Sequence, residues 1–291
     1  MKIGKKIAII GMGLLGGSIG KALISRKLAG TVVGVVRRPE AVTQVVKARS
    51  AHLATCDIAE GVRNADLVIL AVPVEEMSEL ARRILPYIEK NTVITDVGSV
   101  KANVVSRLGK IFARKGIFVG SHPMAGKEKG GLAHADSGLF RDAITIVTPT
   151  AKTSPRAVEA VRLLWESLGS RIVILPPADH DRAVAAVSHL PHIVSVALMN
   201  AASGARTSQV DPFECIGPSF RDMTRVVSSP ADMWAGILVS NKKEVVRVAK
   251  RFADEVQRMV SAVSRGDRRA VTALFDRARS TKDTMNGRNH A

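Results

Sequence analysis

The 291-residue chain is poor in aromatic side chains, with seven Phe, two Trp and one Tyr. Its core must therefore be built from Ala, Val, Ile, Leu and Met, and it offers no aromatic-rich strand on which nucleic-acid bases could stack. Only two cysteines are present, Cys56 and Cys215, and their separation fits neither a metal site nor a redox motif. We therefore expect no bound metal and a reducing, cytoplasmic location.

Long apolar runs are also lacking. We find no stretch that approaches the length of a membrane span, so no membrane partner is expected. The apolar run near the N-terminus is interrupted by glycines at positions 11, 13, 16, 17 and 20. It is better interpreted as strand, turn and helix than as a signal peptide.

Negative charge is in short supply, because 43 Lys and Arg residues face 26 Asp and Glu residues and the net charge is +17. A basic surface attracts anions, nucleic acid included. The cations are scattered along expected helices rather than gathered in a dense block, so small polyanionic ligands fit at least as well and no nucleic-acid partner is expected. A redox-sensing or nucleic-acid-binding protein that kept a nucleotide fold stays as an alternative, suggested only by the charge.

Short β-branched runs alternate with helical stretches in the first half of the chain. The expected strands are Lys6–Ile10, Thr31–Val36, Ala65–Val72, Thr92–Asp96, Gly116–Val119, Ala143–Thr148 and Arg171–Leu175, and the expected helices include Leu14–Leu28 and Pro155–Leu168. This alternation predicts a mainly parallel, doubly wound α/β sheet of the Rossmann type. We assign residues 1–176 to that domain.

After about Pro177 only helical patterns remain. We expect helices over Asp179–Ala202, Met233–Arg265 and Asp267–Lys282, the last two parted at Gly266. Residues 177–291 should therefore form an all-α domain. The stretch Ala183–Ala202 is so apolar that it should be buried, and a domain this poor in aromatics completes its core against another subunit.

A glycine-rich turn near the N-terminus carries the first functional signal. Ile7–Ile10 leads into Gly11, Gly13 and Gly16 in the Gly-x-Gly-x-x-Gly pattern, and a helix follows. The first glycine makes the tight turn, the second admits a pyrophosphate and the third lets helix and sheet pack closely. We place the dinucleotide against Gly11, Met12, Gly13, Leu14, Leu15 and Gly16, with Val72 at the end of the run 65–72 completing the site.

The end of the second strand indicates which dinucleotide binds. NAD sites usually carry an acid there, whereas this strand ends at Val36 and continues with Arg37 and Arg38. Arginine pairs well with a 2′-phosphate, so NADP is predicted over NAD. The alternative is two solvated arginines, with Glu40 arriving late as the acid for NAD.

Two further segments place polar side chains near the expected sheet edge. Gly120–Gly126 holds His122 between glycines with Pro123 beside it, which predicts a rigid, ligand-facing loop without regular structure and a histidine suited to proton transfer. A structural turn whose histidine caps a strand end is the alternative. Ser99, after the strand Thr92–Asp96, is a candidate site residue or an N-cap of the next helix.

The helical half supplies candidate anion ligands. His189 and His192 are three residues apart and share a helix face, with Pro191 kinking the helix. A metal would lack a third ligand, and a hydrogen-bonded pair of core histidines is the alternative to an anion site. Arg221 and Arg225 are natural partners for a carboxylate, unless Asp222 pairs with one of them on a solvated face.

Taken together, these segments resemble the prephenate and arogenate dehydrogenases of tyrosine biosynthesis. The matching pieces occur in the family's order over nearly the whole chain: Gly11–Ser18, Asp96–Lys101, Gly120–Gly126 with Glu128, His189–His192, Phe220–Arg225, Ser229-Pro230 and Met233-Trp234. The resemblance implies a nucleotide-binding domain followed by a helical domain that forms a homodimer.

The resemblance also implies an oxidative decarboxylation. Hydride leaves C4 of the substrate ring for the nicotinamide, the C4 hydroxyl loses its proton and CO2 departs from C1. In that scheme His122 is the base, Ser99 orients the hydroxyl and the nicotinamide, and Arg225 binds a substrate carboxylate. His192, with His189, lines the same pocket, and Glu128 is the gating acid near the entrance.

Two features of the sequence favour different substrates. Val36 stands where NAD-using members have an acid, and NADP use often accompanies arogenate, which carries an amino group where prephenate has a keto group. The His-Leu-Pro-His form of residues 189–192 looks more like prephenate users, so we expect prephenate and the product 4-hydroxyphenylpyruvate. The alternatives are arogenate, giving tyrosine directly, and another NADP enzyme such as a 3-hydroxyacid dehydrogenase or imine reductase.

Overall fold

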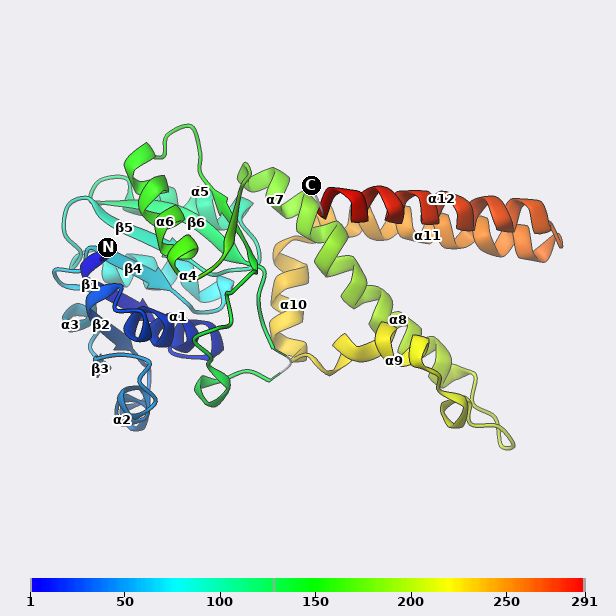
Figure 1. Ribbon diagram of the computed structural model, residues 1–291, viewed down its shortest axis with the longest axis horizontal. Helices are drawn as coiled ribbons and strands as arrows, with labels where there is room; N and C mark the ends of the chain where they lie inside the picture. Colours follow the sequence, from blue (N-terminus) through cyan, green and yellow to red (C-terminus); the bar gives the residue numbers. More distant parts are fainter. Residues whose placement is uncertain (1, 128, 290–291) are drawn as a thin grey trace. The chain divides into compact units, whose positions relative to one another are not determined.

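The computed structural model describes residues 2–127 and 129–289. The chain divides into two compact units, one ending at Lys242 and one beginning at Lys243 (Figure 1). Each unit has its own internal packing and is described separately.

The first unit is built on an eight-stranded sheet in the order β3-β2-β1-β4-β5-β6-β7-β8. The strands are β1 (Gly4–Ile10), β2 (Ala29–Val35), β3 (Leu53–Thr55), β4 (Leu67–Leu70), β5 (Thr92–Asp96), β6 (Gly116–Pro123), β7 (Ile144–Thr148) and β8 (Arg171–Ile174). Neighbours pair parallel except β6 and β7. The predicted doubly wound sheet is thus confirmed, with its order reversing between β1 and β4.

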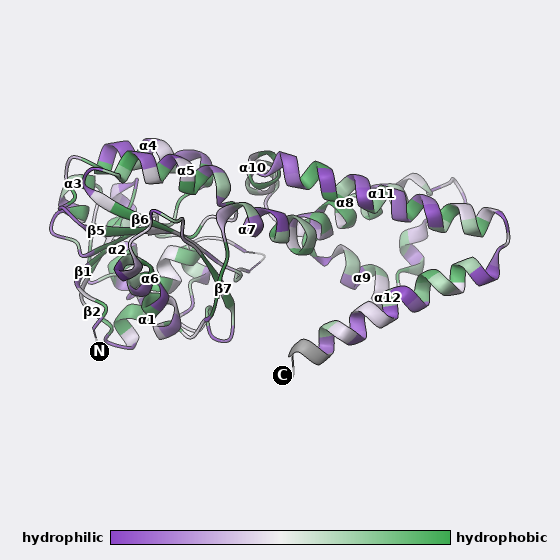
Figure 2. Ribbon diagram, turned by 90° about the horizontal axis from the view of Figure 1, so that it is seen from above, coloured by the Kyte–Doolittle hydropathy of each residue, from purple (hydrophilic) through white to green (hydrophobic). Residues whose placement is uncertain are grey.

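Helices cover both faces of this sheet, as Figure 2 shows. They are α1 (Leu14–Ser25), α2 (Pro39–Lys47), α3 (Ile58–Val62), α4 (Val74–Ile84), α5 (Ala102–Phe112) and α6 (Pro155–Ser167), with a 3-10 turn η1 (Leu132–His134). One apolar core lies against α1, α2 and α6 and the other against α3, α4 and α5. The predicted helix Leu14–Leu28 ends early, at Ser25, because Lys27 adopts a left-handed φ of 55°.

Strand β6 changes its pairing partway along. Residues 116–119 pair parallel with β5, and residues 120–123 pair antiparallel with β7. The expectation of a loop without regular structure is therefore wrong for residues 120–123, because β7 satisfies their backbone as a strand. A Cβ at Gly120 would lie 2.5 Å from the Thr148 hydroxyl oxygen and 2.7 Å from Val105, which explains the glycine.

The rest of the first unit is helical. Its elements are α7 (Pro177–Val184), a π-helical turn η2 (Ala185–His189), α8 (Leu190–Gly204), η3 (Pro212–Cys215), α9 (Pro218–Thr224), η4 (Arg225–Ser228) and α10 (Ala231–Ser240). The π turn ends at His189, two residues before Pro191, so the predicted helix over Asp179–Ala202 is present but irregular. Such turns appear mostly as bulges within longer helices.

The apolar segment within this helix is not buried as predicted. Val187 is 71% exposed and Val196 47% exposed, and α8 buries Ser195 alone. Pro177–Gly204 is long and apolar enough to cross a membrane by length and composition, and only 22% of its most apolar stretch is buried. The expectation that no stretch approaches that length was therefore wrong, although core helices of soluble proteins pass the same test.

The second unit is a helical pair. Most of α11 (Lys242–Ser264) lies in it, followed by α12 (Arg268–Asn289), with Gly266 at φ 65° in the turn between them. Glu255 of α11 pairs with Arg277 of α12 at 2.7 Å. The predicted break at Gly266 is confirmed, but Met233–Arg265 is not one helix, because α10 ends at Ser240 and Asn241 leaves helical geometry.

Candidate active site

Four sequence-predicted positions meet at the carboxyl edge of the sheet. Gly11 follows β1, Val72 lies just beyond β4, Ser99 lies just beyond β5, and His122 is near the end of β6. Ligands of doubly wound sheets bind at this edge, where the strand order reverses. The topology therefore brings the glycine turn and His122 to one side of the first unit.

The glycine turn has the geometry that a pyrophosphate requires. Gly11 has a φ of 93°, and a Cβ there would lie 2.3 Å from the Ala71 carbonyl oxygen. A Cβ at Gly16 would lie 1.9 Å from the Gly11 carbonyl oxygen, whereas one at Gly13 would meet nothing within 4 Å. Helix α1 begins here with no side-chain cap and no acid in its first turn, so its N–H groups fit a dinucleotide phosphate.

Three apolar residues of the predicted cofactor site shape this turn. Met12 is 7% exposed and would touch a Cβ placed on Gly34 of β2. Leu15 packs against the core that underlies α1, and Leu14 begins that helix. Met12 and Leu15 thereby join the turn to the core of the sheet.

At the end of β2 the two predicted arginines are exposed. Arg37 lies 3.5 Å from Glu76 of α4, with side chains that are 85% and 44% exposed. Arg38 occupies the N-cap position of α2, and Glu40 lies in the first turn of that helix. Neither arginine forms a buried ion pair among the described residues. Both follow β2, and in dinucleotide-binding folds the end of the second strand lies beside the ribose.

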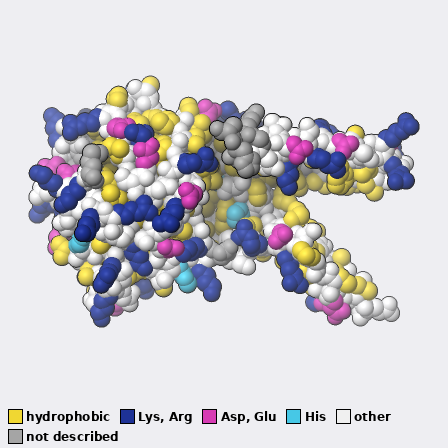
Figure 3. Space-filling view, viewed as in Figure 1, with side chains coloured by type: hydrophobic (Ala, Val, Ile, Leu, Met, Phe, Trp, Pro, Cys, Tyr) yellow, Lys and Arg dark blue, Asp and Glu magenta, His cyan; other side chains and the backbone are white. Residues whose placement is uncertain are grey.

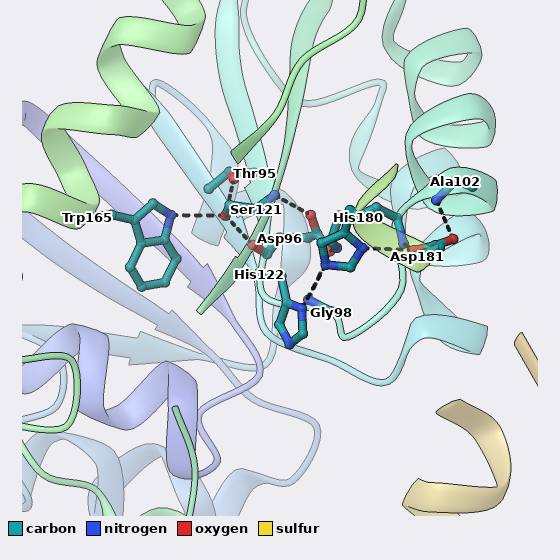
Figure 4. A network of polar contacts seen from close by, with 10 residues as sticks. Thr95, Asp96, Gly98, Ala102, Ser121, His122, Trp165, His180 and Asp181 are labelled. Carbon is teal, nitrogen blue, oxygen red and sulfur yellow. Dashed lines mark hydrogen bonds and ion pairs between the residues drawn. The ribbon is translucent and has the colours of Figure 1, made fainter. Parts of the chain in front are cut away.

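His122 is 7% exposed and belongs to a chain of buried polar groups (Figure 4). Its Nδ1 lies 2.8 Å from Nε2 of His180, and Nδ1 of His180 lies 2.8 Å from Oδ1 of Asp181. Adjacent along β6, Ser121 points to the opposite side, where Trp165 Nε1 donates to its hydroxyl at 2.9 Å. Strand alternation thus aims His122 away from the α6 core.

A buried ion pair between Asp96 and Lys101 supports this chain, and both side chains are fully buried. Asp96 also accepts hydrogen bonds from the N–H groups of Gly98 at 2.9 Å and Ser121 at 3.1 Å. Asp181 accepts from the N–H groups of Lys101 at 2.7 Å and Ala102 at 2.9 Å. The ends of β5 and β6, the start of α5 and helix α7 are thereby tied together.

The electrostatics keep the histidines of this site neutral. Burial lowers the pKa of His122 well below its usual value, with further lowering from His180, Lys101 and His189. Burial likewise lowers the pKa of His180, although hydrogen bonding to Asp181 opposes that shift. A neutral imidazole at neutral pH is able to accept a proton.

His189 and His192 share a face as predicted, and Trp234 contacts both. The His192 and Trp234 rings stack at 3.4 Å between centroids, and His189 meets the same indole edge-on at 6.1 Å. Burial lowers the pKa of His189 to about 4. Among the described residues no hydrogen-bond partner reaches His189 Nε2 or Trp234 Nε1, although both atoms are buried.

The predicted arginines of the helical segment lie in consecutive elements. Arg221 is exposed on α9, and Arg225 is exposed at the start of η4. Arg225 is near enough to His192 to contribute to lowering its pKa, after burial as the main cause. Glu128, the predicted gating acid, lies outside the described residues.

Sequence reasoning did not assign a role to several residues of the site. These are Asp96, Lys101, His180, Asp181 and Trp234. Asp96, Lys101 and Trp234 fall in segments that carried the family resemblance, whereas His180 and Asp181 lie in the expected helix Asp179–Ala202 and belong to no motif. Within residues 2–127 and 129–289, no group of three or more His, Cys, Asp or Glu side chains is arranged to hold a metal ion.

A parallel sheet with a glycine turn at its switch point and a neutral histidine beside it defines a dinucleotide-dependent oxidoreductase. Residues 19–174 match the family described as prephenate dehydrogenase, nucleotide-binding domain, and residues 176–277 match prephenate dehydrogenase, dimerization domain. A cyclohexadienyl dehydrogenase of Zymomonas mobilis is 34% identical, over 92% of this chain and 91% of its own. The chain belongs to the prephenate dehydrogenase family.

Two solved structures share this fold across their full lengths. Prephenate dehydrogenase from Aquifex aeolicus, in complex with hydroxyphenyl propionate and NAD+, has a TM-score of 0.90 at 29% identity and covers 97% of this chain and 98% of its own. Arogenate dehydrogenase from Synechocystis has a TM-score of 0.85 at 26% identity, with 96% and 99% covered. The enzyme is therefore an NAD(P)-dependent oxidoreductase of this fold.

Proposed function

We propose that this enzyme oxidises and decarboxylates prephenate to 4-hydroxyphenylpyruvate, with NADP preferred over NAD. The observation that carries the proposal is His122, a nearly buried imidazole held neutral at the same sheet edge as the glycine turn. A base in that position is what oxidation of a ring hydroxyl beside a nicotinamide requires. The family and the relatives that act on prephenate add support.

The chemistry divides between the dinucleotide and the chain. The nicotinamide, when bound, accepts hydride from C4 of the ring. His122 takes the proton of the C4 hydroxyl as the C–H bond breaks, and Ser99 orients that hydroxyl from the end of β5. The electrons of the C1–carboxylate bond then enter the ring as CO2 leaves, and the proton returns to the C4 oxygen, which becomes a phenol. No further reactant is needed.

The substrate carboxylates have partners in the helical segment. Arg225, with Arg221 on the preceding helix, supplies cationic charge, and His192 and His189 line the same region against Trp234. The buried His189 Nε2 and Trp234 Nε1 are polar atoms that a bound anion or keto oxygen would satisfy. In this proposal Glu128 keeps its role as the gating acid.

The cofactor preference rests on the end of β2. No acid follows Val35 there, and Arg37 and Arg38 are exposed where a 2′-phosphate would lie. Glu76 competes for Arg37 through an exposed pair, which is weak in water. We therefore expect NADP to bind more tightly than NAD.

The assembly proposed is a homodimer formed through helical residues 177–291, with the domain boundary at 176/177. The match of residues 176–277 to a dimerization domain supports it. Figure 3 shows hydrophobic side chains along one side of the α11–α12 pair, where Val256 is 44%, Val260 52% and Phe275 61% exposed. A cytoplasmic location fits the exposed free thiols of Cys56 and Cys215.

One assay tests substrate and cofactor together. Initial rates are measured with prephenate and with arogenate, each with NAD and with NADP, and compared as kcat/KM. We expect the highest value for prephenate with NADP. A higher value for arogenate would replace the proposed substrate, and a clear preference for NAD would overturn the assignment of Arg37 and Arg38.

A further inference from the structure

His180 and Asp181 are buried next to His122 without any assigned role. His180 is fully buried and Asp181 is 5% exposed. Both belong to α7, whereas His122 belongs to β6, so the contact joins parts of the chain that are 58 residues apart. Figure 4 shows the His122 ring, the His180 ring and the Asp181 carboxylate in a continuous chain of hydrogen bonds.

The far end of this chain is anchored as an acceptor. Asp181 Oδ1 accepts from the Lys101 N–H and Oδ2 from the Ala102 N–H, which are fixed backbone donors at the start of α5. Burial alone would raise the pKa of the Asp181 carboxyl, but the hydrogen bonds from His180 and these two N–H groups lower it below its usual value. Asp181 is therefore a carboxylate, which accepts hydrogen bonds and donates none.

Because Asp181 can only accept, the positions of the ring protons on His180 and His122 follow. His180 must donate its Nδ1–H to Asp181, because two lone pairs facing each other at 2.8 Å would repel. A neutral His180 then has a lone pair on Nε2, so it accepts the Nδ1–H of His122 across 2.8 Å. The remaining ring nitrogen of His122, Nε2, is left with a lone pair.

Charged and titratable groups around the two rings favour the same state. His122 is faced by His180 from α7, by Lys101 from the start of α5 and by His189 from η2. His180 is faced by Asp181, by Lys101 and by Asp96 of β5. Burial and Lys101 disfavour a second proton on either ring, which keeps both imidazoles neutral.

We propose that His180 and Asp181 are positioning residues that hold His122 as the Nδ1–H tautomer, with its Nε2 lone pair available for the substrate hydroxyl. The proposal rests on His122 being the base of the proposed function. Once Nε2 of His122 has taken the proton, the Nδ1–H of His122 remains hydrogen-bonded to His180 Nε2. The Asp181 carboxylate then stabilises the His122 imidazolium through the His180 ring. No proton needs to travel along the chain.

Asp181→Asn is the most informative substitution. The Asn oxygen takes the place of Oδ1, which accepts from both the Lys101 N–H and His180 Nδ1, and the NH2 takes the place of Oδ2 beside Ala102. The hydrogen-bonded chain to His122 keeps its direction, but the negative charge that stabilises the His122 imidazolium is lost. We expect kcat to fall by about 100- to 1,000-fold while KM and dinucleotide affinity stay within about two-fold.

The pH profile separates this effect from simple loss of structure. Removing the negative charge of Asp181 makes the His122 imidazolium less stable, so the acid limb of the kcat profile should move to lower pH. A second variant, His180→Leu, leaves the Asp181 cap of α5 in place and should lower kcat in the same way. His180→Gln, whose amide oxygen accepts from His122 Nδ1, should recover part of the loss.

Nitrogen-15 NMR of histidine-labelled enzyme reads the tautomer directly and needs no substrate. The chain has seven histidines, and His122→Asn assigns the signal of interest. We expect Nε2 of His122 to be unprotonated in the wild type and protonated in His180→Leu, where Nδ1 of His122 has lost its acceptor. The control is Asp179→Asn, on the same helix, where the exposed carboxylate pairs with Arg182 at 2.9 Å and should leave rates and spectra unchanged.

The outcomes of the two proposals are distinct. Wild-type enzyme that turns over prephenate, with Asp181→Asn and His180→Leu at wild-type kcat or with Nε2–H seen in the wild type, would overturn the positioning role alone. Failure of the wild type to release CO2 from prephenate would overturn the proposed function, whatever the NMR spectrum shows.

Discussion

The surroundings of His122 fit the role of base that we propose for it. Its position in β6, rather than in a loop, fixes the backbone through pairing with β7. Burial lowers its pKa, and neighbouring Lys101, His180 and His189 lower it further, so the ring is neutral at neutral pH. The side chain is thus both held and kept ready to accept a proton.

Replacing that base should remove most of the chemistry. His122→Asn keeps an amide donor for His180 but has no basic nitrogen. We expect kcat to fall by about 100- to 10,000-fold, the usual worth of a general base. The dissociation constant for NADP, measured by calorimetry, should not change, and near-normal turnover would exclude His122 from this role.

Arg225 provides a complementary test on the binding side. Arg225→Ala should raise KM for the substrate by about 10- to 100-fold, because it removes a charge-assisted hydrogen bond to a carboxylate. NADP affinity is expected to stay the same, and Arg206→Ala, which removes an exposed cation that pairs with Asp211, is the matched control. An equal loss of dinucleotide binding would contradict the assignment.

Single residues were predictable where their signal is local. His122, His189 and His192 lie in short motifs, so the sequence alone identified them as candidate site residues. The contact of His122 with His180 was not predictable, because it arises from the packing of α7 against the end of β6. The same holds for Trp234, whose stacking on His192 follows from the placement of α10.

At the scale of elements, the Asp96–Lys101 pair organises the strand ends that carry the site. It is fully buried, and Asp96 receives N–H groups from the turn after β5 and from β6. A buried pair of this kind adds little net stability, but loss of one partner leaves an uncompensated charge.

Lys101→Met should therefore lower the free energy of unfolding by about 3–5 kcal/mol. Urea unfolding at fixed protein concentration measures it. Lys110→Met, on the exposed side of α5, should change stability by less than about 0.5 kcal/mol. If the double variant Asp96→Asn/Lys101→Met is not more stable than Lys101→Met, the unpaired charge is not the cause.

Elements with strong periodicity were predictable, and junctions were not. The buried strands over 67–70 and 92–96 read directly from their apolar runs. The break at Asn241 did not, since apolar periodicity continues through it and the Asn side chain leaves the helix pattern to donate to the Asp181 carbonyl oxygen at 2.8 Å. The strand structure of residues 120–123 was not predictable, because Gly120 and Pro123 locally disfavour a strand. Pairing with β7, which lies more than 20 residues further along the chain, overrides that preference.

For the whole molecule, three buried histidines link stability to pH. Burial lowers the folded-state pKa of His122, His180 and His189, the last to about 4. Unfolding restores an ordinary pKa of about 6.5, so below that pH the unfolded chain binds more protons. Stability is therefore complete above about pH 6.5 and is lost as the pH falls toward 4.

Each such histidine should cost up to about 1.4 kcal/mol per pH unit in that window. Urea unfolding at pH 7.5 and pH 5.5 should show the loss, and His189→Gln should show a shallower dependence than the wild type. Stability that stays level or rises on acidification would contradict the buried, neutral state of these residues.

The net charge of +17 fits the proposed ligands, because a dinucleotide and prephenate are both anions. The central claim is that each turnover couples hydride transfer to decarboxylation. Its most direct test is to supply prephenate labelled in the C1 carboxylate and count labelled CO2 against reduced NADP. We predict one CO2 for each NADPH; reduced dinucleotide formed without CO2 would contradict the account.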